Sequence, residues 1–327
     1  MKVGRQGNLA RGGELAIAVA ITLLATVVVF VDIPNTSKFM HVLHKTGHPT
    51  VFGLVAVLVL LLVATRKSFA ERPAWARYAV AFVITVVIGA MTEIAQLFTN
   101  RGAAVADVVS DAIGAAACLA WHAAIFSKRG LQNQSGSNPV LVMIASLLSL
   151  VALAPLLWCL GAYAARDTLF PVILQNPSRL DMYFVSSETG NVSVRKMADS
   201  ETQQDAALAV RVAINQGRYP GISLTEPYPG WRHFKTLAVD ITNPGQQQIE
   251  LVIRIHDRQH NYQYEDRFNR AFIIGAGLRT TVEIPLLDVE HSPKGRLMNL
   301  DAIANLAIFA LQPVTDGEFL VHKVWLR

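Results

Sequence analysis

The sequence contains only two cysteines, Cys118 and Cys159, in 327 residues. Both lie inside apolar runs, and residues 165–327 contain no cysteine. The C-terminal half must therefore be held together by an apolar core without disulfides. A bridge between the two cysteines would require their apolar runs to touch at that point, and we expect both to be small buried apolar residues instead.

Charge is also scarce, at 16% of residues against 52% hydrophobic residues, with a mean hydropathy of +0.35. Residues 1–164 carry 12 Lys and Arg against 6 Asp and Glu, whereas residues 165–327 carry 17 against 18. The net positive charge therefore belongs to short segments between apolar runs. It does not indicate a nucleic-acid surface, and no RNA- or DNA-binding motif is present, so we expect no nucleic-acid partner.

The N-terminal half contains apolar runs of the length that crosses a bilayer, about 20 residues each. They predict an α-helical membrane bundle of five transmembrane helices, at about 15–31, 50–65, 78–98, 104–126 and 139–163. Lys and Arg in the connecting segments number nine on the side of the N-terminus and three on the other. By the positive-inside rule the N-terminus is cytoplasmic, and an odd number of spans places the C-terminal half outside the cytoplasm. We expect a multi-pass protein of a bacterial cytoplasmic (inner) membrane.

The C-terminal half changes to an alternation of apolar and polar residues, which is typical of half-buried strands. Clear examples are the runs Leu237–Ile241, Ile249–Ile255, Thr280–Ile284 and Phe319–Leu326, separated by turn signals such as Asn243-Pro-Gly. Several short strands at this spacing predict an all-β sandwich with one core. The predicted organisation is a membrane domain at 1–164, a tether at 165–180 and an extracytoplasmic β-sandwich at 181–327.

Ionisable residues interrupt the apolar runs on what this topology makes the outer side. Asp107 and Asp111 lie one helical turn apart in the fourth run, where a charged side chain costs about 3 kcal/mol or more in hydrocarbon. We expect one outward-facing cluster of polar groups from three segments. Its members are His44, Lys45, His48, Glu93, Gln96, Arg101, Asp107 and Asp111.

Three interpretations of this cluster remain open. Arg101, Lys45 and the histidines are suited to holding an anionic head group, while the carboxylates take hydroxyls or amides. Alternatively, Glu93 or Asp107 acts as a catalytic base with His48 as acid or metal ligand. In the third interpretation, Arg101 pairs with a carboxylate, and the polar groups only tie helices together.

The motifs of this region resemble the VanZ family of membrane proteins over residues 35–125. The matching residues are Lys45-x-x-His48, Glu93-x-x-Gln96, Arg101, Asp107 and Gly114. The chain departs from the family at His44, where members typically have Asp, and at Asp111, where they typically have Asn. The resemblance implies a cell-envelope protein linked to glycopeptide (teicoplanin) resistance, and it implies no particular chemistry.

The C-terminal half resembles the jelly-roll, galactose-binding-like modules of carbohydrate-active proteins. The resemblance covers nearly all of 181–327 and implies a fold more specifically than a ligand. It rests on Tyr228-Pro-Gly-Trp231, Asp257 after a strand, Tyr264–Asn269, Ile284-Pro-Leu, Arg296–Leu300 and the final Val324-Trp-Leu.

Aromatic residues in this half predict either a sugar-binding face or a core. On a sandwich face, rings stack on sugar rings while flanking polar groups pair with hydroxyls. The alternative is that Trp231 and Phe268 fill the core while Tyr262 and Tyr264 cover its rim. The candidate glycan-binding residues are Tyr228, Trp231, Asp257, Tyr262, Tyr264 and Arg267.

Together these patterns predict a membrane protein of the cell envelope that binds membrane lipids and an envelope glycan or lipid-linked saccharide, without cofactor or metal. A membrane-embedded hydrolase or transferase that acts on such a lipid is a second hypothesis. A non-catalytic scaffold for a cell-wall complex is a third.

Overall fold

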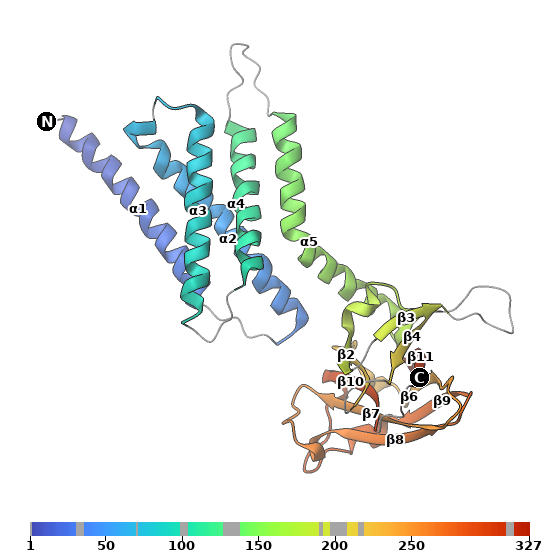
Figure 1. The fold of residues 1–327 in the computed structure, drawn as a ribbon. Helices are drawn as coiled ribbons and strands as arrows, with labels where there is room; N and C mark the ends of the chain where they lie inside the picture. The colour runs from blue at the N-terminus through green and yellow to red at the C-terminus, as the bar shows by residue number, and fades with distance from the viewer. Residues whose placement is uncertain are drawn as a thin grey trace. The chain divides into compact units, whose positions relative to one another are not determined.

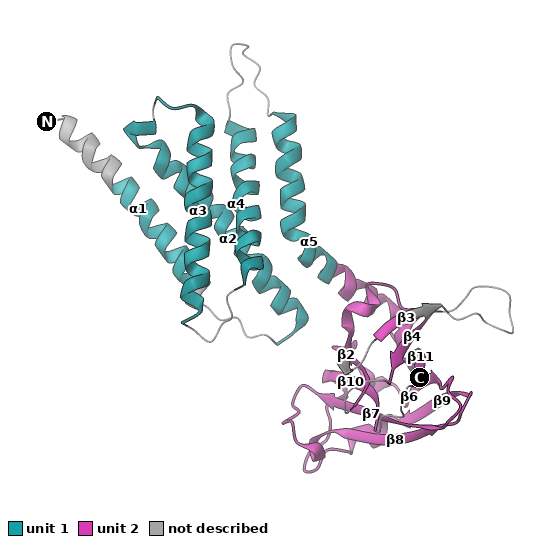
Figure 2. Cartoon of the chain, in the orientation of Figure 1, with its two compact units in different colours: residues 1–159 teal, residues 160–327 magenta. Residues whose placement is uncertain are grey.

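A computed structural model describes residues 2–30, 36–69, 71–98, 104–126, 138–189, 192–196, 208–214, 219–311 and 317–327. The chain forms two compact units, Met1–Cys159 and Leu160–Arg327 (Figures 1 and 2). The first is helical and the second is mostly β-structure, and each is described by itself.

Long helices make up the first unit: α1 (Lys2–Phe30), α2 (Lys38–Ala64), α3 (Ala74–Gln96), α4 (Val105–Phe126) and α5 (Pro139–Leu169), which continues into the second unit. Helix α2 contacts α1, α3 and α4, and α3 also contacts α4. The core between them is formed by apolar residues such as Val55, Val59, Ala81 and Ala115.

Large apolar side chains are also exposed on the outside of this unit, among them Met91, Ile94 and Leu147 at 57–64% exposure. Apolar surface of this extent is unfavourable in water and indicates a membrane-embedded region. Among the described residues, four helices are long and apolar enough to cross a bilayer: α2, α3, α4 and α5. The predicted count of five spans is not matched, because the apolar part of α1 whose side chains are described is the shorter segment Gly12–Val28.

Helix α2 begins well before residue 50, where the sequence analysis begins the second apolar span. The helix instead starts after Ser37, whose side chain accepts a hydrogen bond from the Met40 amide, and it continues through Pro49. Proline removes one helical hydrogen bond, but close packing against α4 compensates at this position. A Cβ atom on Gly114 of α4 would overlap the backbone of Pro49.

Two antiparallel sheets form the β-sandwich of the second unit. In the described residues one sheet has the order β3 (Val192–Lys196), β4 (Leu208–Ala213), β11 (Glu318–Leu326), β6 (Thr236–Thr242) and β9 (Arg279–Pro285), with β1 (Val172–Gln175) also pairing with β11. The other has the order β2 (Val185–Thr189), β5 (Gly221–Thr225), β10 (Ile303–Ala310), β7 (Ile249–Asp257) and β8 (Phe268–Ile274). From β4 to β11 this is the jelly-roll arrangement, 4-11-6-9 on 5-10-7-8.

The core of the sandwich lies between the sheets and follows the predicted alternation. Leu251, Ile253 and Ile255 of β7 are fully buried, as are Leu306 and Ile308 of β10. The residues between them point to the opposite face of the five-stranded sheet.

The segment 165–180, predicted as a tether, holds the last turn of α5 and strand β1. Strand β1 pairs with β11 through Leu174 and Val324. Arg166 lies over the rings of Tyr163 and Phe184 and donates a hydrogen bond to the carbonyl of Glu226. The end of α5 is therefore packed onto the β-unit because its aromatic and charged side chains find partners there.

The contact between α2 and α4 gives a test of the helical unit with a matched control. Gly114→Ala should lower the free energy of unfolding by about 1–3 kcal/mol, because the added methyl group overlaps the Pro49 backbone. Gly47→Ala in α2 has no atom within 4 Å of its added Cβ, so it should leave stability unchanged or raise it by up to about 1 kcal/mol. Thermal unfolding of the two variants in detergent measures both effects, and equal stability would contradict the packing described.

Candidate functional site

Two groups of polar residues are candidates for a functional site, one within each unit. The first lies between α2, α3 and α4. His48 of α2 and Asp111 of α4 approach to 4.0 Å between Nδ1 and Oδ1. The other Asp111 oxygen points at α3, since it lies 3.4 Å from the position of a Cβ on Gly89. Glu93 is one turn further along α3 and accepts a hydrogen bond from the Ala104 amide.

Burial makes this cluster costly. Asp111 is 1% exposed and Glu93 is 4% exposed. Both oxygens of Asp111, Oε1 of Glu93 and the hydroxyl of Thr46 have no hydrogen-bond partner among the described residues. An unsatisfied buried polar group costs about 1–3 kcal/mol, and a charged one costs more. The cluster is therefore a place where a ligand or counter-ion would be stabilising.

The other predicted members of the cluster have different positions. Gln96 is buried, and the ring of His44 stands edge-on to that of His48 with 5.4 Å between centroids. Asp107 is half-buried one turn before Asp111, whereas Lys45 is exposed. Arg101 lies outside the described residues. Within the described part of the chain, no three His, Cys, Asp or Glu side chains are arranged to hold a metal ion.

The second candidate is a pocket of about 270 Å³ on the outer face of the five-stranded sheet. The pairing of strands β8, β7 and β10 determines which residues form the floor of this pocket. Ala271, Val252 and Phe309 are directly opposite one another across β8, β7 and β10. Val252 and Phe309 are buried although they point away from the core, and with Ala307 they form a small apolar cluster.

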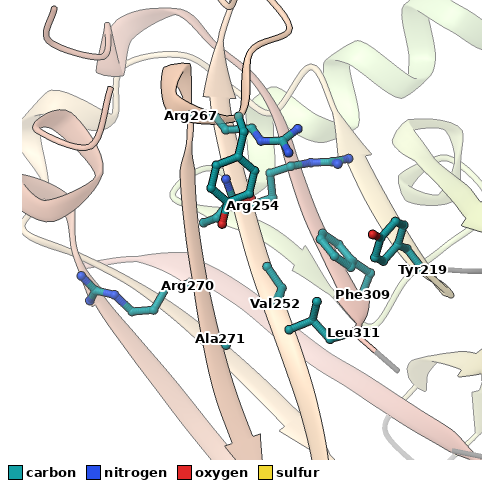
Figure 3. Close-up of a pocket in the computed structure, with 10 residues that line it drawn as sticks. Tyr219, Val252, Arg254, Arg267, Arg270, Ala271, Phe309 and Leu311 are labelled. Carbon is teal, nitrogen blue, oxygen red and sulfur yellow. The ribbon is translucent and has the colours of Figure 1, made fainter. Parts of the chain in front are cut away.

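Aromatic and polar side chains form the walls of this pocket (Figure 3). Tyr219 stands edge-on to Phe309, with 5.7 Å between ring centroids, and is 42% exposed. Arg254 lies over the Phe309 ring at 5.3 Å, and Arg267 lies over the Tyr264 ring at 5.1 Å. The remaining lining residues are Asn269, Arg270 and Leu311.

Gly221 allows Phe309 to form this floor. It is paired with Phe309 across β5 and β10, and a Cβ atom at Gly221 would overlap the Phe309 side chain. Asn269 contributes an unused donor, since its buried Nδ2 has no hydrogen-bond partner among the described residues. The pocket thus combines ring faces with hydrogen-bond donors, which is the chemistry that binds a sugar ring and its polar substituents.

Only two of the six candidate glycan-binding residues line this pocket, Tyr264 and Arg267. Tyr262 is 90% exposed and is not among the lining residues. Tyr228 packs against Phe170, with 4.4 Å between ring centroids. Trp231 is fully buried and donates its Nε1 proton to the Tyr228 carbonyl. It belongs to the core, so its prediction as a ligand contact is wrong.

The prediction of Asp257 as a ligand contact is also wrong, because Asp257 is 1% exposed and paired inside the protein. Arg296 donates two hydrogen bonds to Asp257, of 2.7 and 2.9 Å, and one of 2.5 Å to Asp266. Burial alone would raise the pKa of Asp257, but the bonds from Arg296 and the Asn299 amide hold it below its usual value. The Arg296 hydrogen bond lowers the pKa of Asp266 to about 2. This network closes the loop between β7 and β8.

The sequence analysis did not select Tyr219, Arg254, Asn269 or Phe309. The outward position of Arg254 could have been predicted from the sequence pattern, since Arg254 alternates with Ile253 and Ile255 and must point away from the core. Tyr219 and Phe309 gave no such signal, because the pairing that brings them together joins residues far apart in the sequence.

Comparisons with known proteins found partial similarities to solved structures. No family model matches the chain, and no curated protein matches it. A family 11 carbohydrate-binding module from Clostridium thermocellum, solved with a β-1,3-1,4-mixed-linked tetrasaccharide, is 18% identical over 44% of this chain and 88% of the module, with a TM-score of 0.32. A family 28 carbohydrate-binding module specific for non-crystalline cellulose is 8% identical over 48% of this chain and 93% of the module, with a TM-score of 0.35.

An exo-β-agarase is 14% identical over 44% of this chain, with a TM-score of 0.35. The chain spans only 23% of the length of that enzyme. We derive the ligand chemistry from the pocket itself.

The Asp257–Arg296–Asp266 network predicts a pH dependence of stability. The folded-state pKa of each carboxyl lies below the unfolded value of about 3.9, so the stabilisation is complete above about pH 5 and is lost as the pH falls toward 2. Arg296→Met should lower the free energy of unfolding at pH 7 by about 3–5 kcal/mol, since it removes the guanidinium that pairs with both buried carboxylates. The same substitution should also make the free energy of unfolding fall less steeply as the pH is lowered.

Lys294→Met is the control for this prediction. Lys294 pairs with Glu265 at the surface, where both side chains are more than half exposed. Removal of such a pair should change stability by less than about 1 kcal/mol. Thermal unfolding from pH 7 to pH 2 measures both variants, and an equal response would contradict the role given to Arg296.

Proposed function

We propose that this protein is a membrane protein whose β-sandwich binds a saccharide of the cell envelope in the pocket on its five-stranded sheet. The observation that supports this function is the combination of Phe309, Tyr219 and Tyr264 with the unsatisfied amide of Asn269. Aromatic faces bind sugar rings, and the buried Asn269 amide, which has no hydrogen-bond partner among the described residues, is a donor for an acceptor on the sugar.

The helical unit anchors this module to the membrane and supplies a second site. In this proposal it is a VanZ-like domain of five spans in a bacterial cytoplasmic membrane, with the N-terminus inside and the sandwich outside. The bias of Lys and Arg among the connecting segments supports this orientation. The buried cluster of His48, Glu93 and Asp111 would hold the polar head group of a lipid-linked saccharide. A tether between two such sites raises the effective concentration of ligand, so each can bind weakly alone.

Aromatic substitutions test the sandwich pocket. Tyr264→Ala and Tyr219→Ala should each weaken retention on a saccharide column about tenfold, because a ring contact with a sugar contributes about 1 kcal/mol or more. Tyr262→Ala should bind like the wild type, since Tyr262 is exposed but lies outside the pocket. Affinity electrophoresis of the full chain against envelope polysaccharides measures this. If only Tyr262→Ala lost saccharide binding, the ligand would bind outside this pocket.

Asp111→Asn tests the cluster between the helices. The neutral amide avoids the cost of a buried carboxylate that has no hydrogen-bond partner among the described residues, so the melting temperature in detergent should rise by a few degrees. Retention of envelope lipids, measured by mass spectrometry of the purified protein, should fall. The half-buried Asp107→Asn is the control, with a smaller change in stability. A strong decrease in stability on Asp111→Asn would mean that its carboxylate serves the fold and holds no ligand.

A further inference from the structure

The polar side of the sandwich pocket consists of hydrogen-bond donors with positive charge. Arg254 and Arg267 lie over the rings of Phe309 and Tyr264, and both line the pocket. In Figure 3 their side chains extend in the same direction, whereas Arg270 extends to the other side. Arg270 donates a 2.9 Å hydrogen bond to Asp288, so its charge is already balanced.

The strand register fixes where these donors stand. Asn269 is directly opposite Arg254 across β8 and β7, and Arg254 is directly opposite Ala307 of β10. The unsatisfied Nδ2 of Asn269 is therefore on the same cross-strand row as the Arg254 guanidinium. The next row, formed by Ala271, Val252 and Phe309, is apolar.

Acidic side chains do not line the pocket in the described part of the chain. Glu265 follows Tyr264 but is paired with Lys294. Glu250 points to the same side of the sheet as Arg254 and lies four residues earlier on β7, roughly 13 Å away. The guanidinium groups of Arg254 and Arg267 thus stand at one end of the pocket, beside an apolar floor.

We propose that this pocket recognises an oxyanion on its saccharide, so that its ligands are acidic glycans bearing carboxylate, sulfate or phosphate groups. Two guanidinium groups and an amide donor match the acceptor-only character of such a group. The sugar ring then lies on the apolar row, against Phe309 and Tyr219. This inference rests on the proposed saccharide-binding function and adds the class of saccharide.

Matched oligosaccharides test the proposal on the full chain in lipid nanodiscs. The probes are an oligogalacturonate, a sulfated chondroitin oligosaccharide and an uncharged cello-oligosaccharide of equal length. At least one acidic probe should bind at least tenfold more tightly than the uncharged one. Its affinity should fall as NaCl rises from 50 to 500 mM, because salt screens the attraction. Inorganic phosphate and sulfate should compete only weakly, since they lack the ring.

Variants of the pocket locate the effect. Arg254→Gln and Arg267→Gln should each lower the affinity for the acidic probe by roughly 10–100-fold, the range for a hydrogen bond to a charged group. Asn269→Asp should do the same by placing a negative charge where a donor stood. Arg232→Gln is the control, since Arg232 pairs with Asp301 away from the pocket and should leave binding unchanged.

The outcomes separate this inference from the proposed function. Equal binding of uncharged and acidic probes, with loss in Tyr264→Ala, would overturn the anionic specificity and leave a saccharide site. Binding of no probe would overturn both. If Arg232→Gln weakened binding of the acidic probe as much as Arg254→Gln did, the effect would be one of general surface charge. That result would also overturn the proposal.

Discussion

The alternation of side chains along β7 and β10 determines what the sandwich presents to a ligand. Ile253 and Leu306 must face the other sheet to build a core without disulfides, so their neighbours Arg254 and Ala307 must face outward. The outward positions then combine an apolar row with a row of donors. The floor of the pocket is a direct consequence of how the two sheets bury their apolar faces, and the connection between β7 and β8 adds Tyr264 and Arg267 to its walls.

Close approach of backbones has a comparable role in both units. Gly221 lets Phe309 lie flat across β5, and Gly114 lets α4 approach Pro49 of α2. In the helical unit this approach also brings His48 next to Asp111. Small residues are the usual means of packing helices in a membrane, where the hydrophobic effect does not drive helix association. In each unit, therefore, a glycine positions the side chains that the proposed ligand would contact.

Much of the architecture could be predicted from the sequence because apolar periodicity reports burial directly. The long apolar runs and the alternating strands predicted a helical part and a β-sandwich. The structure has both, and four of its described helices are long and apolar enough to cross a membrane. The limits are equally physical. The motif Tyr228–Trp231 reads as a sugar platform, but Gly230 adopts a positive φ of 92° and directs Trp231 into the core. The second apolar run begins at about residue 50, but α2 extends back through Pro49 to Lys38, and Pro49 lies against Gly114 of α4.

The proposed site was harder to predict than the fold for one reason. Tyr219, Arg254, Asn269 and Phe309 come from separate segments, and only strand order and register bring them together. A structure of the full chain with a bound acidic oligosaccharide tests this account most directly. The account predicts a sugar ring against Phe309 and Tyr219, with its anionic group held by Arg254 and Asn269. A saccharide bound on the six-stranded sheet instead, with the pocket empty, would contradict it.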